Sequence, residues 1–283
     1  MTPAQARQEM RDAVMMEVRD LTLATQKQPV AVRMYRPALQ TLAPVLMYFH
    51  GGGWVAGDLD THDSFCRVIS EWAKCAVIAV DYARPPEYPF PRAVEDCYAA
   101  TAWVARNGAG LGLDTRRIAV AGGGTGGGLV AVVCQIARDL GEPAIGFQLL
   151  LYPIVDCLAR NRSRAEFAEG FGLTTELLEW YLSQYVPPGI PLAHPWLSPA
   201  CGTCLQGLPA TMIITAGCDL LRDEGRAFAR KLRKAGVPVR HKEYSGMRHG
   251  FMNHPGAEAN ARRAILFCAE ALAAHYHRRD TSA

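Results

Sequence analysis

Three segments of the chain hold residue types that could do chemistry together. The stretch HGGGW spans 50–54, Asp219 lies in TAGCDLLRDEG (215–225), and His249 lies in YSGMRHGF (244–251). A glycine-rich loop can present backbone N–H groups to a developing oxyanion, and a histidine beside a carboxylate can act as a base. Each feature has an ordinary alternative, since the loop could be a tight turn and an isolated Asp or His a surface or capping residue. Their joint occurrence in this order favours a site for acyl chemistry.

A fourth segment, IAVAGGGTGGGL (118–129), runs from an apolar strand into glycines where a strand-to-helix turn would present a nucleophile. Gly124 lies in the middle of this turn and has no side chain. Thr125 is one residue late, so we expect its hydroxyl to point away from the site and its N–H to point toward it. No cysteine or serine lies in the turn. Glycine relieves a backbone strain of about 1–3 kcal/mol at such a position, so it does not harm the fold.

Short apolar strands alternate with helical stretches through most of the chain. The two runs 17–25 and 29–37 alternate like an antiparallel hairpin. Beyond them, the expected strands span 45–49, 76–80, 117–121, 145–152, 211–215 and 239–244, and the expected helices span 92–106, 126–140, 222–235 and 257–275. This order is typical of a mainly parallel sheet flanked by helices. Asp219 and His249 would then both lie at the carboxyl edge of the sheet, where α/β sites form.

One long segment, about 157–209, interrupts this alternation, and its length is typical of a functional lid. Within it, LTTELLEWYLSQYVPP predicts a helix capped by Thr174 or Thr175. Together with a predicted amphipathic helix in about 1–16, the segment would form a small helical cap. Its aromatic side chains could line a substrate pocket or only dock the cap onto the core. The residues that we assign to substrate binding are Trp54, Phe167, Phe171, Trp180 and Tyr181.

Length and charge limit the possible classes of protein. The 283 residues, of 30.9 kDa, can form one globular domain over 1–283 with a full core. The 30 basic and 27 acidic residues are scattered along the chain, so nucleic acid is not an expected partner. The charged run 222–224 beside Asp219 is predicted to be an exposed helix start rather than a second acid site. The N-terminus lacks a signal-peptide core and no run reaches the roughly 20 apolar residues of a membrane span, so we expect a cytoplasmic protein.

The nine cysteines are an odd number and lie mostly in apolar stretches. We predict buried free thiols in a reducing compartment. Cys201 and Cys204 form one CxxC, but no second pair follows at the spacing of a zinc ribbon. The sequence therefore predicts no metal site.

The sequence resembles the α/β-hydrolase family of hormone-sensitive lipase-like carboxylesterases. HGGGW, DYARPPEYPFPRAVED (81–96), the glycine turn, AGCDLLRDEG and GMRHGF carry the resemblance, in the family's order, between about residues 40 and 277. It implies an α/β-hydrolase fold, carboxylesterase activity on a small-molecule ester, and no cofactor. It also implies an oxyanion hole of Gly52, Gly53 and the N–H of Thr125, with Asp219 orienting the base His249. Many relatives form homodimers, a state that no feature of this sequence specifies.

The glycine turn departs from the family's pattern, which reads G-D-S-A-G-G. The nucleophilic serine aligns with Gly124, and Gly123 and Gly128 replace the usual Asp and Asn. The chain could be an acyl hydrolase whose serine was replaced by engineering or lost naturally. It could instead be a natural lyase or cyclase that uses His249 as a base on a small biosynthetic intermediate. It could also be a catalytically silent ligand-binding protein. We favour the hydrolase, because the oxyanion glycines, Asp219 and His249 are retained. A site without its nucleophile can keep about 10³–10⁴-fold catalysis over water.

Overall fold

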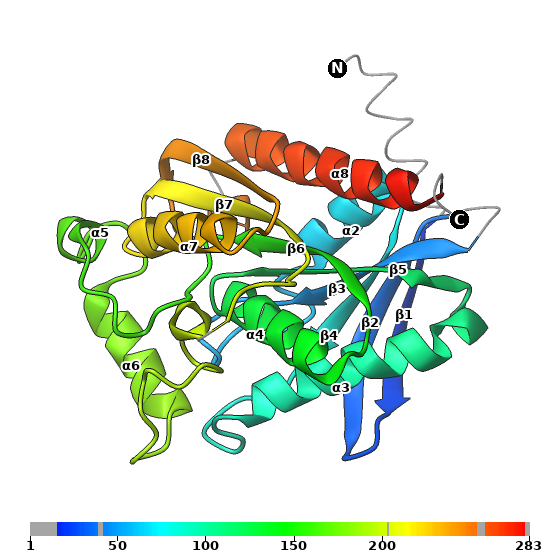
Figure 1. The fold of residues 1–283 in the computed structure, drawn as a ribbon, viewed down its shortest axis with the longest axis horizontal. Helices are drawn as coiled ribbons and strands as arrows, with labels where there is room; N and C mark the ends of the chain where they lie inside the picture. The colour runs from blue at the N-terminus through cyan, green and yellow to red at the C-terminus, as the bar shows by residue number, and fades with distance from the viewer. Residues whose placement is uncertain (1–15, 39–41, 203, 254–257, 281–283) are drawn as a thin grey trace.

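The computed structural model describes residues 16–38, 42–202, 204–253 and 258–280, which form an α/β-hydrolase fold around one sheet (Figure 1). The strands lie in the order β1-β2-β4-β3-β5-β6-β7-β8. Their bounds are Glu17–Ala24, Pro29–Arg36, Ala43–Phe49, Ala76–Asp81, Leu113–Gly123, Ile145–Leu151, Ala210–Cys218 and Val239–Arg248 for β1 to β8. The predicted hairpin is confirmed as the antiparallel pair β1 and β2. The predicted helix within 1–16 lies outside the described residues.

The sheet is parallel from β4 to β8, as the alternation of strands and helices predicts. All seven residues of β3 are buried, whereas β1 at the edge keeps one buried residue among its eight. A strand buried on both faces is a continuous apolar run, which explains why APVLMYF and AVIAVD lack the alternation of the hairpin. The parallel strands therefore bring their carboxyl ends, and the motifs that follow them, to one edge.

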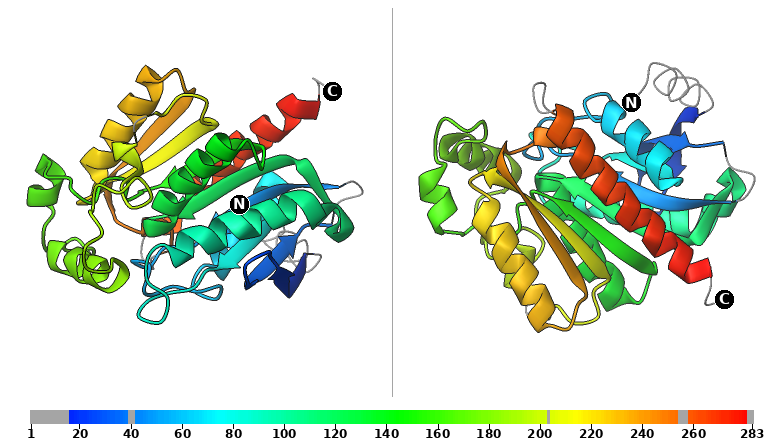
Figure 2. Two further views of the ribbon diagram at one scale, coloured as in Figure 1. Left: turned by 60° about the horizontal axis from the view of Figure 1, so that its bottom comes forward. Right: turned by 90° about the horizontal axis from the view of Figure 1, so that it is seen from above.

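Helices cover both faces of the sheet (Figure 2). The helices α2 (Asp63–Ala73) and α8 (Glu258–Asp280) pack on one face, and α3 (Arg92–Asn107), α4 (Thr125–Leu140) and α7 (Arg222–Lys234) pack on the other. The predicted helices at α3, α4, α7 and α8 are confirmed within a few residues. The helix α2 was not among the predicted helices, although its buried Phe65, Cys66, Ile69 and Ala73 have helical spacing. Short 3-10 helices complete the chain at Gly108–Leu111, Pro199–Cys201 and Phe251–Asn253.

The segment 157–209 carries α5 (Arg162–Glu166) and α6 (Thr175–Tyr185), which lie beside the sheet rather than in its two helical layers (Figure 1). The predicted cap of α6 is confirmed, because the Thr174 hydroxyl oxygen accepts the N–H of Leu177 at 3.1 Å. Tyr185, at the end of α6, is fully buried. Its ring stacks on Trp54 at 4.6 Å between centroids and meets Phe90 edge-on at 5.8 Å. These contacts fix α6 above the HGGGW loop.

All nine cysteines are free thiols, and Cys201 and Cys204 are exposed. Within the described residues, no three His, Cys, Asp or Glu side chains gather as a metal site would require. No helix in the described part of the chain is both long enough and apolar enough to span a membrane.

Candidate active site

Asp219 and His249 meet at the carboxyl ends of the neighbouring strands β7 and β8. The Nδ1 atom of His249 lies 2.8 Å from Oδ2 of Asp219. The other carboxylate oxygen, Oδ1, accepts the N–H of Leu221 at 2.9 Å, and Asp219 is only 1% exposed. A buried carboxylate held at both oxygens fixes the imidazole with its proton on Nδ1. Nε2 of His249 is then the nitrogen with a free lone pair.

The glycine turn joins β5 directly to α4, as its sequence predicts. Gly124 alone separates the two elements, with φ of 55° and ψ of −116°. Its N–H donates to the carbonyl of Leu151 at 2.9 Å, and its own carbonyl accepts the N–H of Ile154 at 3.1 Å. A Cβ atom at Gly126 would lie 2.0 Å from the carbonyl oxygen of Phe49, so only glycine allows α4 to approach β3 this closely. Neighbouring elements therefore hold the turn rigidly.

Position 124 faces the imidazole. A Cβ atom built on Gly124 would lie 3.0 Å from Nε2 of His249 and 3.4 Å from Cε1. A cavity of about 570 Å³ opens over this point, and its lining includes Gly52, Gly53 and Thr125. The structure thus brings the glycine loop, the turn and the histidine of the sequence analysis into one cavity, with Asp219 directly behind the histidine.

His50 anchors the glycine loop. Its ring stacks on Tyr82 at 4.1 Å, and the Tyr82 hydroxyl donates to the His50 carbonyl at 2.8 Å. Beyond this anchor, the N–H groups of Gly52 and Gly53 have no acceptor among the described residues. The N–H of Thr125 belongs to the first turn of α4, where helical N–H groups lack partners within the helix. Three donors therefore border the cavity beside position 124.

The Thr125 hydroxyl oxygen accepts the N–H of Trp54 at 3.4 Å, so this side chain is tied to the glycine loop. Thr125 is also buried, with 6% of its surface exposed. The Thr125 hydroxyl therefore helps to hold the N–H donors of the glycine loop in place. It belongs to the residue after Gly124, and position 124 is the one that faces Nε2 of His249.

We predict a loss of stability in mild acid because of His50. Burial is the main cause that lowers the pKa of this 2%-exposed histidine from 6.5 to about 4, and nearby His62 and Arg84 lower it further. As the pH falls from about 6.5 to 4, the unfolded chain binds a proton at His50 that the folded chain does not, so His50 alone should lower the free energy of unfolding by about 3 kcal/mol. Urea denaturation at several pH values measures this slope.

The control for this measurement is the exposed His277. His50→Gln should make the pH dependence of unfolding less steep by this amount. His62 and His241, whose pKa values burial also lowers, contribute to the dependence that remains. His277→Gln should leave the dependence unchanged. Equal slopes in the two variants would contradict the role of His50.

His62 lines the same cavity and was not among the residues predicted from the sequence. Its Nε2 accepts the N–H of Gly51 at 3.4 Å, and its Nδ1 lies 3.0 Å from the hydroxyl of Thr61. Since that hydroxyl donates to the carbonyl of Asp58 at 2.9 Å, it accepts the proton on Nδ1. His62 therefore supports the start of the glycine loop. The only signal in the sequence was its position, a few residues after HGGGW.

The structure separates the aromatic residues that we assigned to substrate binding. Tyr181 lines the cavity. Trp54 is buried against Tyr185, Phe167 packs edge-on against Phe171 at 4.9 Å, and Trp180 is 48% exposed. None of these four lines the cavity. The segment 157–209 contributes apolar side chains instead, from Leu173, Leu177 and Leu178.

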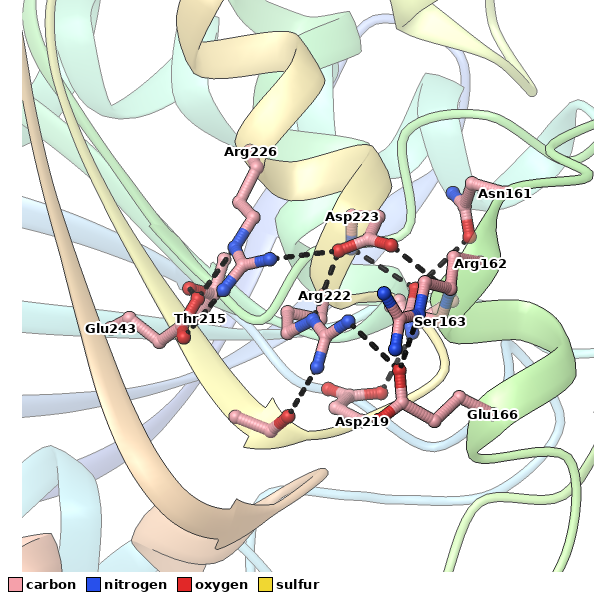
Figure 3. A network of polar contacts seen from close by, with 12 residues as sticks. Asn161, Arg162, Ser163, Glu166, Thr215, Asp219, Arg222, Asp223, Arg226 and Glu243 are labelled. Atoms are coloured by element: carbon pink, nitrogen blue, oxygen red, sulfur yellow. Dashed lines mark hydrogen bonds and ion pairs between the residues drawn. The ribbon is translucent and has the colours of Figure 1, made fainter.

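The predicted exposed helix start at 222–224 is wrong, because α5 covers the first turn of α7. Glu224 is 3% exposed and accepts the N–H of Val155 at 2.9 Å. Its other oxygen pairs with Arg164 of α5 at 2.6 Å. Figure 3 shows the neighbouring contacts, in which the N–H of Ser163 donates to Asp223 at 3.0 Å. The network joins the segment 157–209 to the helix that follows Asp219.

The chain belongs to the α/β-hydrolase fold family, whose model matches residues 46–253. It is similar to the carboxylic ester hydrolase LipN of Mycobacterium tuberculosis, at 42% identity over 84% of this chain and 65% of LipN. It is also similar to the esterase LipI of the same organism, at 40% identity over 88% of this chain and 79% of LipI. Because these relatives are ester hydrolases, the chain belongs to the carboxylesterase kind within this family.

Solved structures agree with this family. The chain superposes on a thermostable esterase of Pseudomonas putida ECU1011 with a TM-score of 0.90, at 36% identity, over 98% of this chain and 91% of that one. An esterase of Pyrobaculum calidifontis gives a TM-score of 0.89, at 36% identity, over 97% of this chain and 94% of that one. The resemblance to carboxylesterases in the sequence analysis is confirmed at the level of family and fold.

Proposed function

We propose that the chain is a carboxylic ester hydrolase that works without a covalent nucleophile, with Gly124 at the position of the family's serine. One observation supports this most directly: a Cβ atom at position 124 would lie 3.0 Å from Nε2 of His249. In this proposal Asp219 orients His249, and the N–H groups of Gly52, Gly53 and Thr125 form the oxyanion hole. The 2.8 Å contact between Asp219 and His249 also supports it.

Water takes the place of the serine in this proposal. Nε2 of His249 removes a proton from a water molecule beside Gly124, and the water oxygen forms a bond to the carbonyl carbon of the ester. The oxyanion hole binds the negative charge on the carbonyl oxygen. The bond to the leaving oxygen then breaks, and His249 returns the proton to it. The products are a carboxylic acid and an alcohol.

The cavity favours small neutral esters with an apolar acyl or alcohol group. Leu173, Leu177, Leu178 and Tyr181 provide its apolar side. No Lys, Arg, Asp or Glu among the described residues lines it, so a charged substrate group would lose its hydration without an opposite charge. We further propose that the segment 157–209 forms the cap of a single-domain enzyme.

The test is ester hydrolysis by this chain and by its His249→Ala variant. With p-nitrophenyl butyrate at neutral pH, loss of the base should lower the protein-dependent rate by about 10²-fold or more, because general base catalysis contributes 10²–10⁴-fold. His277→Ala is the matched control at an exposed position and should keep the full rate. An unchanged rate in His249→Ala would contradict the proposal. Ligand binding without any ester turnover would instead favour a silent binding protein.

A further inference from the structure

Among the described residues, the space at the Cβ position of Gly124 is bordered closely only by the imidazole of His249. Apart from the two chain neighbours of Gly124, no described atom other than Nε2 and Cε1 of His249 lies within 4 Å of its Cβ position. Gly124 and His249 both line the cavity, so this space is continuous with the place where a substrate would lie. A family member with a serine fills the space with a hydroxymethyl group. Here it can hold a small molecule of similar size.

The groups around this space are suited to a neutral molecule that carries a proton on a nucleophilic atom. Nε2 of His249 is a hydrogen-bond acceptor, because Nδ1 donates to Asp219 at 2.8 Å. The ring of Tyr152 forms one wall, edge-on to the imidazole at 5.1 Å. No Lys or Arg among the described cavity residues would compensate an anionic nucleophile. The site therefore suits small alcohols or hydroxylamines better than azide or carboxylates.

We infer that the space at Gly124 is a binding site for a small neutral acyl acceptor, and that the protein transfers the acyl group of an ester directly to this acceptor in one displacement. This inference rests on the proposed function, because it uses the same Asp219–His249 pair and the same ester. It adds a second substrate, with its own saturable site, that competes with water.

The transfer is balanced without any further reactant. Nε2 of His249 takes the proton of the acceptor while the acceptor's nitrogen or oxygen forms a bond to the ester carbonyl carbon. The carbonyl electrons move to the oxygen, which the proposed oxyanion hole binds. They return as the bond to the leaving oxygen breaks, and the imidazolium gives its proton to that oxygen. An ester and hydroxylamine thus yield a hydroxamate and an alcohol, and no bond to the protein forms.

The experiment measures p-nitrophenol and butyryl hydroxamate from p-nitrophenyl butyrate at rising hydroxylamine concentrations, with the uncatalysed reaction subtracted. We expect p-nitrophenol release to rise and then saturate, and hydroxamate to account for the increase. Gly124→Ala places a methyl group in the space and should lower hydroxamate formation by about 10²-fold. Gly110→Ala is the matched control, because its Cβ would meet nothing within 4 Å and its hydroxamate yield should not change.

A second measurement does not depend on the folding of a variant. In the unaltered protein, hydroxylamine should saturate, whereas the bulkier N-tert-butylhydroxylamine should give no saturation because it does not fit beside Nε2. A linear dependence on both acceptors, or a covalent acyl-protein found by mass spectrometry, would overturn the inference and leave ester hydrolysis standing. Absence of any protein-dependent p-nitrophenol release, with or without hydroxylamine, would instead overturn the proposed function.

Discussion

Gly124→Ser is expected to raise ester hydrolysis by about 10³-fold or more, because removal of the serine from a complete serine triad costs about 10⁶-fold in kcat. The other parts of such a triad are in contact here. Nε2 of His249 lies 3.0 Å from the Cβ position of residue 124, and Nδ1 lies 2.8 Å from Asp219. A serine hydroxyl at this position could donate to Nε2 and attack the ester carbonyl.

The added side chain should also lower stability. The backbone at Gly124 has φ of 55°, a conformation that costs about 1–3 kcal/mol for a residue with a Cβ atom. The 3.0 Å contact is tight as well, so His249 must move by a few tenths of an ångström. Thermal denaturation should therefore show that Gly124→Ser is less stable than the unaltered chain, in the same protein that gains activity.

The measurement compares the unaltered chain with Gly124→Ser on p-nitrophenyl acetate and butyrate. A pre-steady-state burst of p-nitrophenol should appear only with serine, since only serine can form an acyl-enzyme. Gly124→Ala is the control for the effect of a side chain without a hydroxyl, and should show no gain. A serine variant that folds but stays at the original rate would mean that the site is remodelled beyond residue 124.

Gly128 shows where such remodelling would lie. A Cβ atom there would come within 2.5 Å of the carbonyl oxygen of Ile154, so the asparagine of the family's pattern does not fit this backbone. Ile154 also donates its N–H to the carbonyl of Gly124. The segment that follows β6 thus lies close to the turn, and Gly124→Ser leaves this contact unchanged.

The sequence predicted the fold and the meeting of Asp219 with His249 because parallel strands bring their carboxyl ends together. Local order along the chain was enough for that inference, since Asp219 directly follows β7 and His249 directly follows β8. It was not enough for the pocket. Tyr181 and Tyr185 lie one turn apart on nearly the same face of α6, yet Tyr181 lines the cavity while Tyr185 stacks on Trp54. Which of the two side chains reaches the cavity depends on how the whole segment docks.

Burial of charge was the second point that local sequence could not reveal. The run at 222–224 has the composition of a solvated first helical turn, with acidic residues near the N-terminus. Its Glu224 is buried because Arg164, 60 residues earlier in the chain, pairs with it. Such a partner lies in a segment without regular pattern, so only the three-dimensional structure identifies it.

Asp219→Asn in the Gly124→Ser protein should lower kcat by about 10⁴-fold and leave KM nearly unchanged. The reason lies in the two hydrogen bonds of the carboxylate. The amide oxygen of an asparagine would keep the bond from the N–H of Leu221, which leaves its NH₂ group facing Nδ1 of His249. Nδ1 would then accept, the proton would move to Nε2, and the imidazole could no longer take the serine's proton.

Kinetics of the double variant measure this directly, and Asp139→Asn is the matched control. Asp139 is exposed and pairs only with its neighbour Arg138 among the described residues, so its replacement should leave kcat unchanged. A loss below about tenfold in Asp219→Asn would contradict the orienting role, since a wrong tautomer removes the base almost completely. A loss in kcat at constant KM would tie the fully buried carboxylate to the proton transfer rather than to ester binding.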